Sequence, residues 1–377
     1  MNSHANFENS ENTGELLKIA RNSLGLTLQS VGDQLGLSVS TLSEIERGKR
    51  KTSSIELFKL SKIYRRPIDY FLMDCEAHSS FSALYRAAEN ESVSKDALIK
   101  FQDLCNNYRF ITQVMKVPET TSLPDYSERK QIVSQAEAIA EEERRALRLD
   151  GQPIKDIVDL LESRRGVKIF HMPEIGDGFS GAMASDKYYG TCFLINADHP
   201  QVRRIFTIAH EYAHSIAHRN QQVHIDFVNR VNQNSQQEKF ADSFAAAFLM
   251  PKGAVDEFVD GLCASNKDID GLVILRVAIY FGVSFTAAGW RLFTLQKLSR
   301  QQWEKIRQQH IPTSPVAKAI GYRDEGGSQE LLPRRYKYLC YKAYEKGDIS
   351  LQKLAELLNR NYFDLKQEIE ADSLIEV

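Results

Sequence analysis

Two histidines and a glutamate stand in a pattern that could bind a metal ion and activate water. His210 and His214 are four residues apart, and Glu211 follows the first of them. On a helix, positions i and i+4 lie one above the other, so both imidazoles could direct a ring nitrogen at one Zn²⁺. Glu211 could then take a proton from the metal-bound water. The alternative is a pair of core histidines whose partners are all protein groups.

A second pair with the same spacing follows further along the chain. Glu238 and Asp242 are also at i and i+4, at the start of an apolar stretch that predicts a helix. Zinc peptidases with two histidine ligands need a carboxylate from a second helix and an open position for water. We therefore expect Glu238 to be the third ligand. Asp242 would accept the distal N–H of a ligand histidine and fix its tautomer, although the reverse assignment of the two carboxylates stays open.

Other side chains near the motif could support the same site. We expect His218 to position a ligand rather than to bind the metal, because an extended motif would need histidine where Asn220 stands. Three residues are candidates to stabilise an oxyanion, and each could equally be an ordinary polar residue: His224, Tyr188 and Tyr189.

The five cysteines are scattered and include no Cys-x-x-Cys pair, which is typical of reduced thiols in a cytoplasmic protein. A thiolate is a good zinc ligand, so we hypothesise that Cys105 occupies the open metal position at rest as an inhibitory ligand. The alternative is a small buried apolar residue, as free cysteines commonly are. Cys192, on a predicted strand near the motif, is the rival inhibitory ligand.

A helix-turn-helix is predicted near the N-terminus. Thr27 can cap one short helix, Gly36 provides the turn, and Ser38 can cap the next helix. A recognition helix needs short polar residues near its start and basic residues nearby to hold phosphates. The expected DNA contacts are Ser38, Ser40, Thr41, Arg47, Lys49, Arg50 and Lys51. Because Glu44 places an acid on the face toward DNA, a dimerisation or docking module that keeps only this fold stays open.

The charge distribution agrees with a DNA-binding N-terminus. The whole chain has 48 basic and 50 acidic residues, a formal net charge of −2, which excludes a uniformly basic coat. Between Glu15 and Arg66, however, ten basic residues face five acidic ones. The positive charge is thus concentrated where contacts with phosphates would be made.

The composition is that of a globular protein, with 42% hydrophobic and 26% charged residues among 377. No apolar run approaches the ~20 residues that span a bilayer. The polar N-terminus has no features of a secretory signal. We therefore expect a cytoplasmic protein with no membrane partner.

Periodicity predicts an α+β fold that is mostly helical. Strands are expected at 167–170, 178–185 and 189–196, and helices from about 200 to 298. The strand at 189–196, directly before the motif helix, is interpreted as an edge strand that holds an extended substrate or as a core strand, and the two interpretations are compatible. The expected domains are a five-helix unit at 1–74, a helical linker at 75–127, a metal-binding domain at 128–298 and a helical domain at 299–377.

Both halves of this plan resemble known families. Residues 36–50, GLSVSTLSEIERGKR, are similar to the Xre/Cro-type repressor domain, although Leu28 stands where that family usually has glutamine. The runs RRIFTIAHEYAH and EKFADSFAAAFLMP resemble the ImmA/IrrE metallopeptidases. That resemblance extends from about residue 128 to the C-terminus. It implies a zincin-like (gluzincin) domain with a small β-sheet, in which His210, His214 and Glu238 bind Zn²⁺ and Glu211 is the base.

The resemblance also implies a function. Such enzymes cleave a partner repressor and so derepress genes of a DNA-damage, stress, phage-defence or mobile-element system. The implied partners are a small helix-turn-helix repressor as substrate and double- or single-stranded DNA, and a homodimer is an open possibility. One alternative is a transcription factor whose zinc domain is a non-proteolytic sensor or dimerisation module. Another is a toxin–antitoxin-like partner that acts by binding alone.

Overall fold

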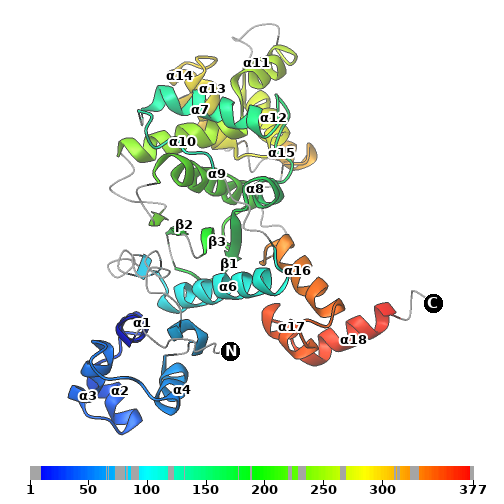
Figure 1. The fold of residues 1–377 in the computed structure, drawn as a ribbon. Coiled ribbons are helices and arrows are strands. Elements are labelled where there is room, and N and C mark those ends of the chain that lie inside the picture. Colours follow the sequence, from blue (N-terminus) through cyan, green and yellow to red (C-terminus); the bar gives the residue numbers. More distant parts are fainter. Residues whose placement is uncertain are drawn as a thin grey trace.

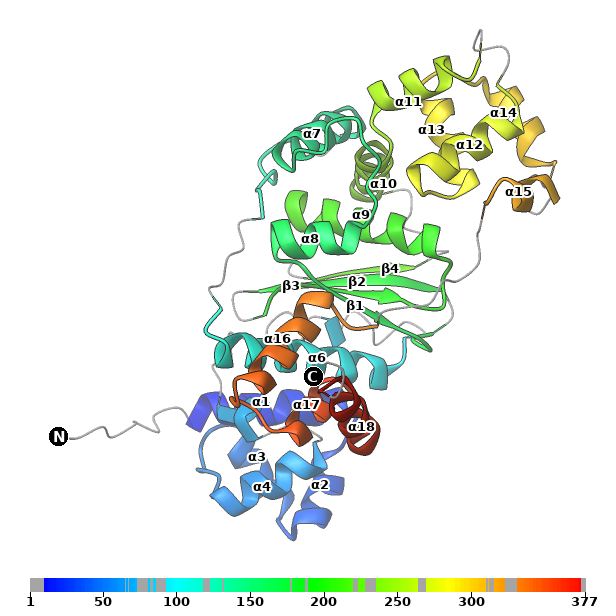
Figure 2. The ribbon, with the colours of Figure 1, turned by 90° about the vertical axis from the view of Figure 1, so that its right-hand side faces the viewer.

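The chain folds into layers of helices above and below a small β-sheet (Figures 1 and 2). The computed structural model describes residues 10–64, 66, 68–72, 81, 84–85, 93–117, 123–130, 132–176, 178–186, 189–219, 223–227, 235–263, 269–309, 311, 315–322 and 331–373. The predicted α+β class is confirmed: the molecule is mostly helical, with a helix-turn-helix unit and one four-stranded mixed sheet.

The sheet has the strand order β1-β3-β2-β4. β1 (Lys168–Met172) pairs in parallel with β3 (Gly190–Asn196). β2 (Phe179–Asp186) runs antiparallel to both β3 and β4 (Val223–Phe227). The first three strands agree with the sequence prediction. β3 lies inside the sheet, so the edge-strand interpretation of this segment is wrong and the core-strand interpretation holds.

β4 corrects the prediction that the chain is helical from about 200 to 298. Residues 223–227 read Val-His-Ile-Asp-Phe, which alternates apolar and polar positions with the period of a strand. Five residues are too few to show this period clearly between two helices. Pairing with β2, almost forty residues away in sequence, decides the conformation, with a register shift between Phe179 and Gly181.

Helices cover both faces of the sheet (Figure 2). α8 (Ile157–Arg165) and α9 (Gln201–Ala217) lie on one face, while α6 (Lys95–Val114) and α16 (Arg334–Glu345) lie on the other. The side chains of β3 alternate accordingly. Phe193 and Ile195 enter the core that includes α9, and Cys192 and Leu194 enter the core that includes α6 and α16.

Two of the predicted units therefore contribute to the same core. α6 comes from the range predicted as a linker, and α16 comes from the range predicted as a separate C-terminal domain, yet both pack under the sheet. α17 (Leu351–Leu357) and α18 (Tyr362–Ser373) continue from α16. The predicted domain boundaries themselves stay predictions.

A second set of helices builds the core above α9. It comprises α7 (Val133–Ala146), α10 (Gln236–Leu249), α11 (Lys252–Asp260), α12 (Gly271–Phe281), α13 (Phe285–Thr294), α14 (Arg300–Arg307) and α15 (Pro315–Ala319). α10 lies between α7 and α9 and packs closely on both. The buried Arg144 of α7 fixes this arrangement by donating to the backbone oxygen of Phe248 on α10 at 2.6 Å.

The N-terminal unit consists of α1 (Ser10–Ser23), α2 (Leu28–Leu35), α3 (Val39–Glu46), α4 (Ser54–Ile63) and the 3-10 helix η1 (Ile68–Leu72). The predicted caps are confirmed. Thr27 accepts from the backbone of Ser30, Ser38 accepts from that of Thr41, and Gly36 has φ 71° in the turn. A two-point ion pair between Arg21 and the buried Glu46 ties α1 to α3, with nitrogen–oxygen distances of 2.6 and 2.9 Å.

Among the described residues no single helix is long and apolar enough to cross a membrane. α12 and α13, bent by 106°, pass that test only when taken together.

Packing between α13 and α14 gives a testable case. A Cβ added at Gly289 would lie 2.1 Å from the indole of Trp303, which is almost fully buried. We expect Gly289→Ala to lower the free energy of unfolding by about 1–3 kcal/mol through overpacking. Gly253→Ala is the matched control, because nothing lies within 4 Å of that position. The control should raise stability by up to about 1 kcal/mol through helix propensity. Thermal denaturation of both variants checks this, and equal effects would contradict it.

Candidate functional site

The candidate metal centre begins on α9. His210 and His214 lie on the face of this helix that is turned toward α10, and the two Nε2 atoms approach to 3.1 Å. Both side chains are buried, and Glu211 between them is completely inaccessible to water. The apolar residues around the motif drive this burial, because the rest of α9 packs on the sheet and on α10. The four-residue spacing brings the imidazoles together as expected.

α10 supplies the facing carboxylate. Glu238 Oε2 lies 3.3 Å from His210 Nε2, and Glu238 Oε1 lies 3.6 Å from His214 Nε2. A tetrahedral site with metal–ligand distances of ~2.0–2.1 Å has edges of about 3.3–3.4 Å. The donor separations of 3.1, 3.3 and 3.6 Å therefore fit a tetrahedral metal of the size of zinc. A histidine and glutamate cluster that could bind a metal is thus present.

His224 of β4 joins the same cluster. Its Nε2 lies 3.1 Å from Glu238 Oε1 and its Nδ1 lies 3.3 Å from Glu211 Oε2. The ring stacks on that of His214, with centroids 3.6 Å apart. Donor atoms of His210, His214, His224 and Glu238 all lie within 4.8 Å of one another. The sequence suggested His224 only as an oxyanion candidate, because β4 was not predicted.

Two further side chains hold the ligand histidines from behind. Asp242 Oδ1 lies 3.0 Å from His210 Nδ1, and His218 Nδ1 lies 2.8 Å from His214 Nδ1. A carboxylate on Nδ1 keeps the proton there and leaves the Nε2 lone pair free for a metal. In this geometry Glu238 faces the Nε2 atoms and Asp242 supports His210. The reverse assignment of the two carboxylates does not fit it.

Burial and mutual repulsion keep part of the cluster neutral. Burial lowers the pKa of His214 well below its usual range, and the neighbouring histidines lower it further. Burial likewise lowers the pKa of His218 to about 4. Both are therefore neutral at pH 7, as a ligand imidazole must be.

His224 behaves differently. Burial disfavours its charge, but attraction to Glu211 and hydrogen bonds to Glu211 and Glu238 outweigh this and raise the pKa of His224 to about 9. Burial also opposes the charge of Glu238, yet hydrogen bonds from His210 and His224 hold its pKa below the usual range. His224 thus lies between the carboxyl groups of Glu211 and Glu238 and is hydrogen-bonded to both.

Glu211 has a free oxygen. Its Oε2 faces His224, whereas Oε1 is buried without a hydrogen-bond partner. β2 can approach this carboxylate because residue 181 is glycine: a Cβ there would lie 2.7 Å from Thr207 Cγ2 and 3.3 Å from Glu211 Oε1. Sequence reasoning missed Gly181. A glycine in a strand can mark a place where another element approaches the backbone closely, but that element has to be known before the glycine can be interpreted in this way.

The structure does not bring the cysteines to the cluster. Cys105 of α6 and Cys192 of β3 are both buried in the core under the sheet, on the face opposite α9. The hypothesis that either is an inhibitory metal ligand is therefore wrong for this conformation. The alternative, a buried small residue, holds for both.

Tyr189 also points into the core under the sheet, and its hydroxyl donates to Asn106 Oδ1 at 2.8 Å. It is thus removed from the oxyanion candidates. Tyr188 lies outside the described residues.

The candidate DNA contacts gather around the start and end of α3. Ser38, Ser40, Arg47, Lys49 and Lys51 are exposed, while Thr41 and Arg50 are half-buried. The Ser38 hydroxyl lies 2.8 Å from those of Ser40 and Thr41, so the helix cap occupies it. Arg50 pairs with Glu56 at 2.9 Å. No acidic side chain pairs with the other cations of this set, Arg47, Lys49 and Lys51, among the described residues, so their charges can face phosphates.

Comparison with known families identifies both units. Residues 17–71 match a helix-turn-helix family. Residues 162–293, which include α9, β4 and α10, match the IrrE N-terminal-like domain. The chain joins an Xre-type helix-turn-helix domain to an ImmA/IrrE-type peptidase domain. The resemblance seen in the sequence is therefore confirmed, and the histidine and glutamate cluster lies inside the IrrE-like domain.

The curated relatives of this chain include a transcriptional regulator. The transcriptional regulator ClgR of two strains of Mycobacterium tuberculosis is 39% identical over 64 residues. The match covers 17% of this chain and 57% of each relative, so the chain spans little more than half of the regulators it resembles. Over this segment the chain is similar to a transcriptional regulator.

The position of Cys105 yields a test. We expect Cys105→Ser to leave metal content and the rate of any metal-dependent reaction unchanged, because the sheet separates this thiol from the cluster. Metal content is measured by elemental analysis of the purified full chain. Cys263→Ser, at the only described cysteine that is not fully buried, is the matched control. A rise in basal activity specific to Cys105→Ser would revive the inhibitory-ligand hypothesis.

Proposed function

We propose that this protein is a zinc-dependent endopeptidase that cleaves a partner transcriptional repressor in the cytoplasm. Cleavage would derepress genes of a stress, DNA-damage, phage-defence or mobile-element system, under control of the helix-turn-helix domain. The observation that carries the proposal is Glu211, a fully buried carboxylate with one unpartnered oxygen beside the four donor residues of the cluster. A purely structural site needs no such group, whereas peptide hydrolysis needs a base there.

The residues divide the work as follows. His210, His214 and Glu238 would hold the zinc ion, which would supply Lewis acidity toward water and the scissile carbonyl. Glu211 accepts the proton of the attacking water on Oε1 and returns it to the leaving amine. His224 is hydrogen-bonded to Glu211 Oε2. The other oxygen of this carboxylate, Oε1, has no hydrogen-bond partner and is available for the proton. Asp242 fixes the His210 tautomer.

The sheet and the N-terminal domain both support this substrate class. β4 is the last strand of the described sheet and carries His224, so an extended peptide paired along its outer edge would lie next to the cluster. The helix-turn-helix domain, with its excess of basic residues, would bring the enzyme to DNA where a repressor is bound. A small helix-turn-helix repressor is the partner that meets both conditions.

A second candidate function is a transcription factor whose zinc domain is a non-proteolytic sensor or dimerisation module. His224 favours it, because four protein donors close a tetrahedral shell as in structural zinc sites. The two functions differ in what His224 does: in the peptidase it acts on Glu211 and substrate, and in the module it is a ligand.

Glu211→Gln tests the proposed base. The amide keeps the size of the side chain but cannot accept the proton. We therefore expect an unchanged zinc content and a loss of at least about 100-fold in cleavage of the candidate substrate, which is any small helix-turn-helix protein that an adjacent gene encodes. Cleavage is followed by gel electrophoresis and mass spectrometry of the repressor. Glu142→Gln, an exposed residue paired with Arg129, is the control and should cleave normally. Full activity of Glu211→Gln would contradict the assignment of Glu211 as the base.

His224→Ala separates the two candidate functions. For the peptidase we expect one bound zinc, unchanged within about tenfold in affinity, and cleavage slowed by about tenfold or more. X-ray absorption of the wild-type zinc protein should then show two imidazoles rather than three. His199→Ala, at the other end of α9, is the control. Three imidazoles, together with a loss of zinc affinity beyond about 100-fold in His224→Ala, would favour the non-proteolytic module.

A further inference from the structure

A cavity of about 190 Å³ lies at the start of α9, distinct from the metal centre. Its walls come from β1, from the first residues of α8 and α9, and from the segment that leads into α16. The lining residues that matter are Lys155, Asp156, His171, Arg204, Leu332 and Arg334. Arg204 and His210 are separated along α9 by about 9 Å of helix rise, so the two sites share a helix but not their side chains.

Arg204 is the unusual feature of this cavity. Four arginines in the described part of the chain are buried: Arg66, Arg144, Arg204 and Arg291. The first donates to Asp103 and Tyr85, the second to backbone oxygens, and the fourth to Glu137 and Met250. Arg204 is only 6% exposed, and its Nε is buried without any partner.

The Arg204 Nε–H is unfavourably placed, because burial removes water from it and no protein group accepts its hydrogen bond. Burial also lowers the pKa of Arg204, and no carboxylate opposes that effect. The guanidinium borders a cavity with room for roughly six waters at their liquid volume of ~30 Å³. An anion held there would supply the missing hydrogen-bond acceptors.

The neighbouring groups suit an anion. Lys155 and Arg334 stand at the mouth, and His171 lies beside Arg204. Burial and the charge of Arg204 lower the pKa of His171 to about 4, so its ring is neutral at pH 7 and can donate one hydrogen bond. Asp156 is the one acid in the lining, and it is engaged by Arg334 at 3.0 Å and by the backbone of Asp159.

We propose that this cavity binds a phosphate group, either as inorganic phosphate or as the terminal phosphate of a small ligand. Arg204 would provide paired N–H donors from the floor, which match two oxygens of a tetrahedral oxyanion. Lys155 would approach from the mouth and His171 from the side. This proposal does not depend on the metal or on the peptidase activity.

Occupancy of the cavity would join two parts of the molecule. Arg204 belongs to the helix that carries the candidate metal ligands, and Leu332 and Arg334 lead into α16 under the sheet. A bound phosphate would therefore tie the C-terminal helices to the helix of the metal centre.

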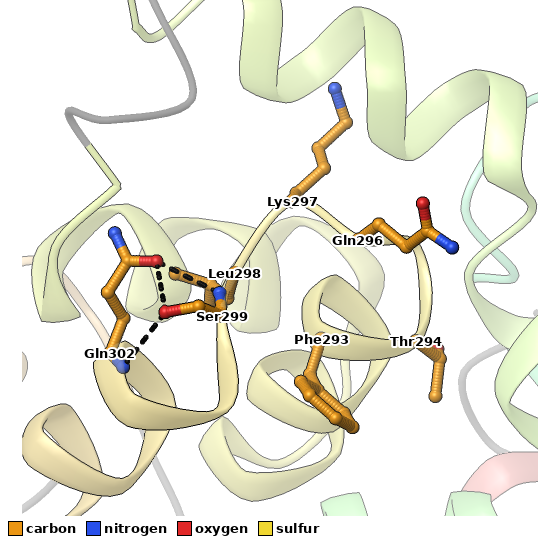
Figure 3. Close-up of a pocket in the computed structure, with 7 residues that line it drawn as sticks. All are labelled: Phe293, Thr294, Gln296, Lys297, Leu298, Ser299 and Gln302. Carbon is orange, nitrogen blue, oxygen red and sulfur yellow. Dashed lines mark hydrogen bonds between the residues drawn. The ribbon is translucent and has the colours of Figure 1, made fainter.

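A second cavity among the described residues has no comparable features. It measures about 620 Å³ and lies between the end of α13 and the start of α14 (Figure 3). Lys297 is the only charged residue among the seven that line it, and Asp256 and Asp260 already hold that ammonium, each at 3.2 Å.

Thermal denaturation of the full chain tests the proposal, with inorganic phosphate and AMP as probes and adenosine and chloride at equal ionic strength as controls. We expect both phosphates, but not adenosine, to raise Tm in a concentration-dependent manner. Tighter binding of AMP would assign the site to a phosphorylated ligand, and equal binding would assign it to the free anion. Titration calorimetry should then give a dissociation constant that Arg204→Met weakens by about tenfold or more.

Arg204→Met should itself fold, because methionine removes an unpaired buried charge and keeps an apolar body of similar length. Lys155→Ala, at an exposed residue, is a second variant that does not threaten folding and should weaken binding several-fold. Arg203→Met, next to Arg204 but in contact with Ser180, is the matched control and should bind normally. No phosphate-specific rise in Tm, or a rise that Arg204→Met and Lys155→Ala both retain, would overturn the proposal.

Discussion

The candidate metal centre depends on the contact between α9 and α10, whose polar side chains face each other. Both helices are otherwise packed through apolar residues in one core, so the imidazoles and the Glu238 carboxylate are held together rather than solvated. α7 fixes α10 from the other side through Arg144 and the backbone of Phe248. Groups desolvated in this way need partners. The Nε2 atoms of His210 and His214 and the oxygens of Glu238 lie about 3.1–3.6 Å apart, which is the separation of ligand atoms around one metal ion.

Local sequence signals predicted much of this arrangement. The i, i+4 pairs on α9 and α10 are properties of a helix alone, so the spacing placed His210 beside His214, and Glu238 beside Asp242, without knowledge of the fold. The expectation that the two pairs face each other came from the ligand set of zinc peptidases. The caps of α2 and α3 are equally local. The presence of a helix-turn-helix and of a helix pair with metal donors therefore followed from the sequence.

The remaining features depend on long-range pairing. β4 is five residues long and exists because it pairs with β2, so His224 could not be assigned to the cluster beforehand. Gly181 matters only because α9 crosses β2 there. Side chains of β3 alternate between the two faces of the sheet, and this places the Cys192 thiol in the core under it. A shift of one residue would turn the thiol toward α9. The distance of Cys105 from the cluster depends in turn on which face of the sheet α6 covers.

The same layering constrains how DNA could influence the metal centre under the proposed function. Arg66, at the end of the helix-turn-helix unit, is buried against α6 through Asp103 and Tyr85. α6 packs under the sheet, and the sheet separates it from α9. An effect of DNA must therefore pass through α6 and the strands rather than through a side chain that reaches the metal. β2 and β4 are the natural carriers, because β2 passes so close to Glu211 at Gly181 that a Cβ there would lie 3.3 Å from Glu211 Oε1. His224 of β4 bridges Glu211 to Glu238. A small slide of these two strands would change the surroundings of Glu211 without breaking the helix pair.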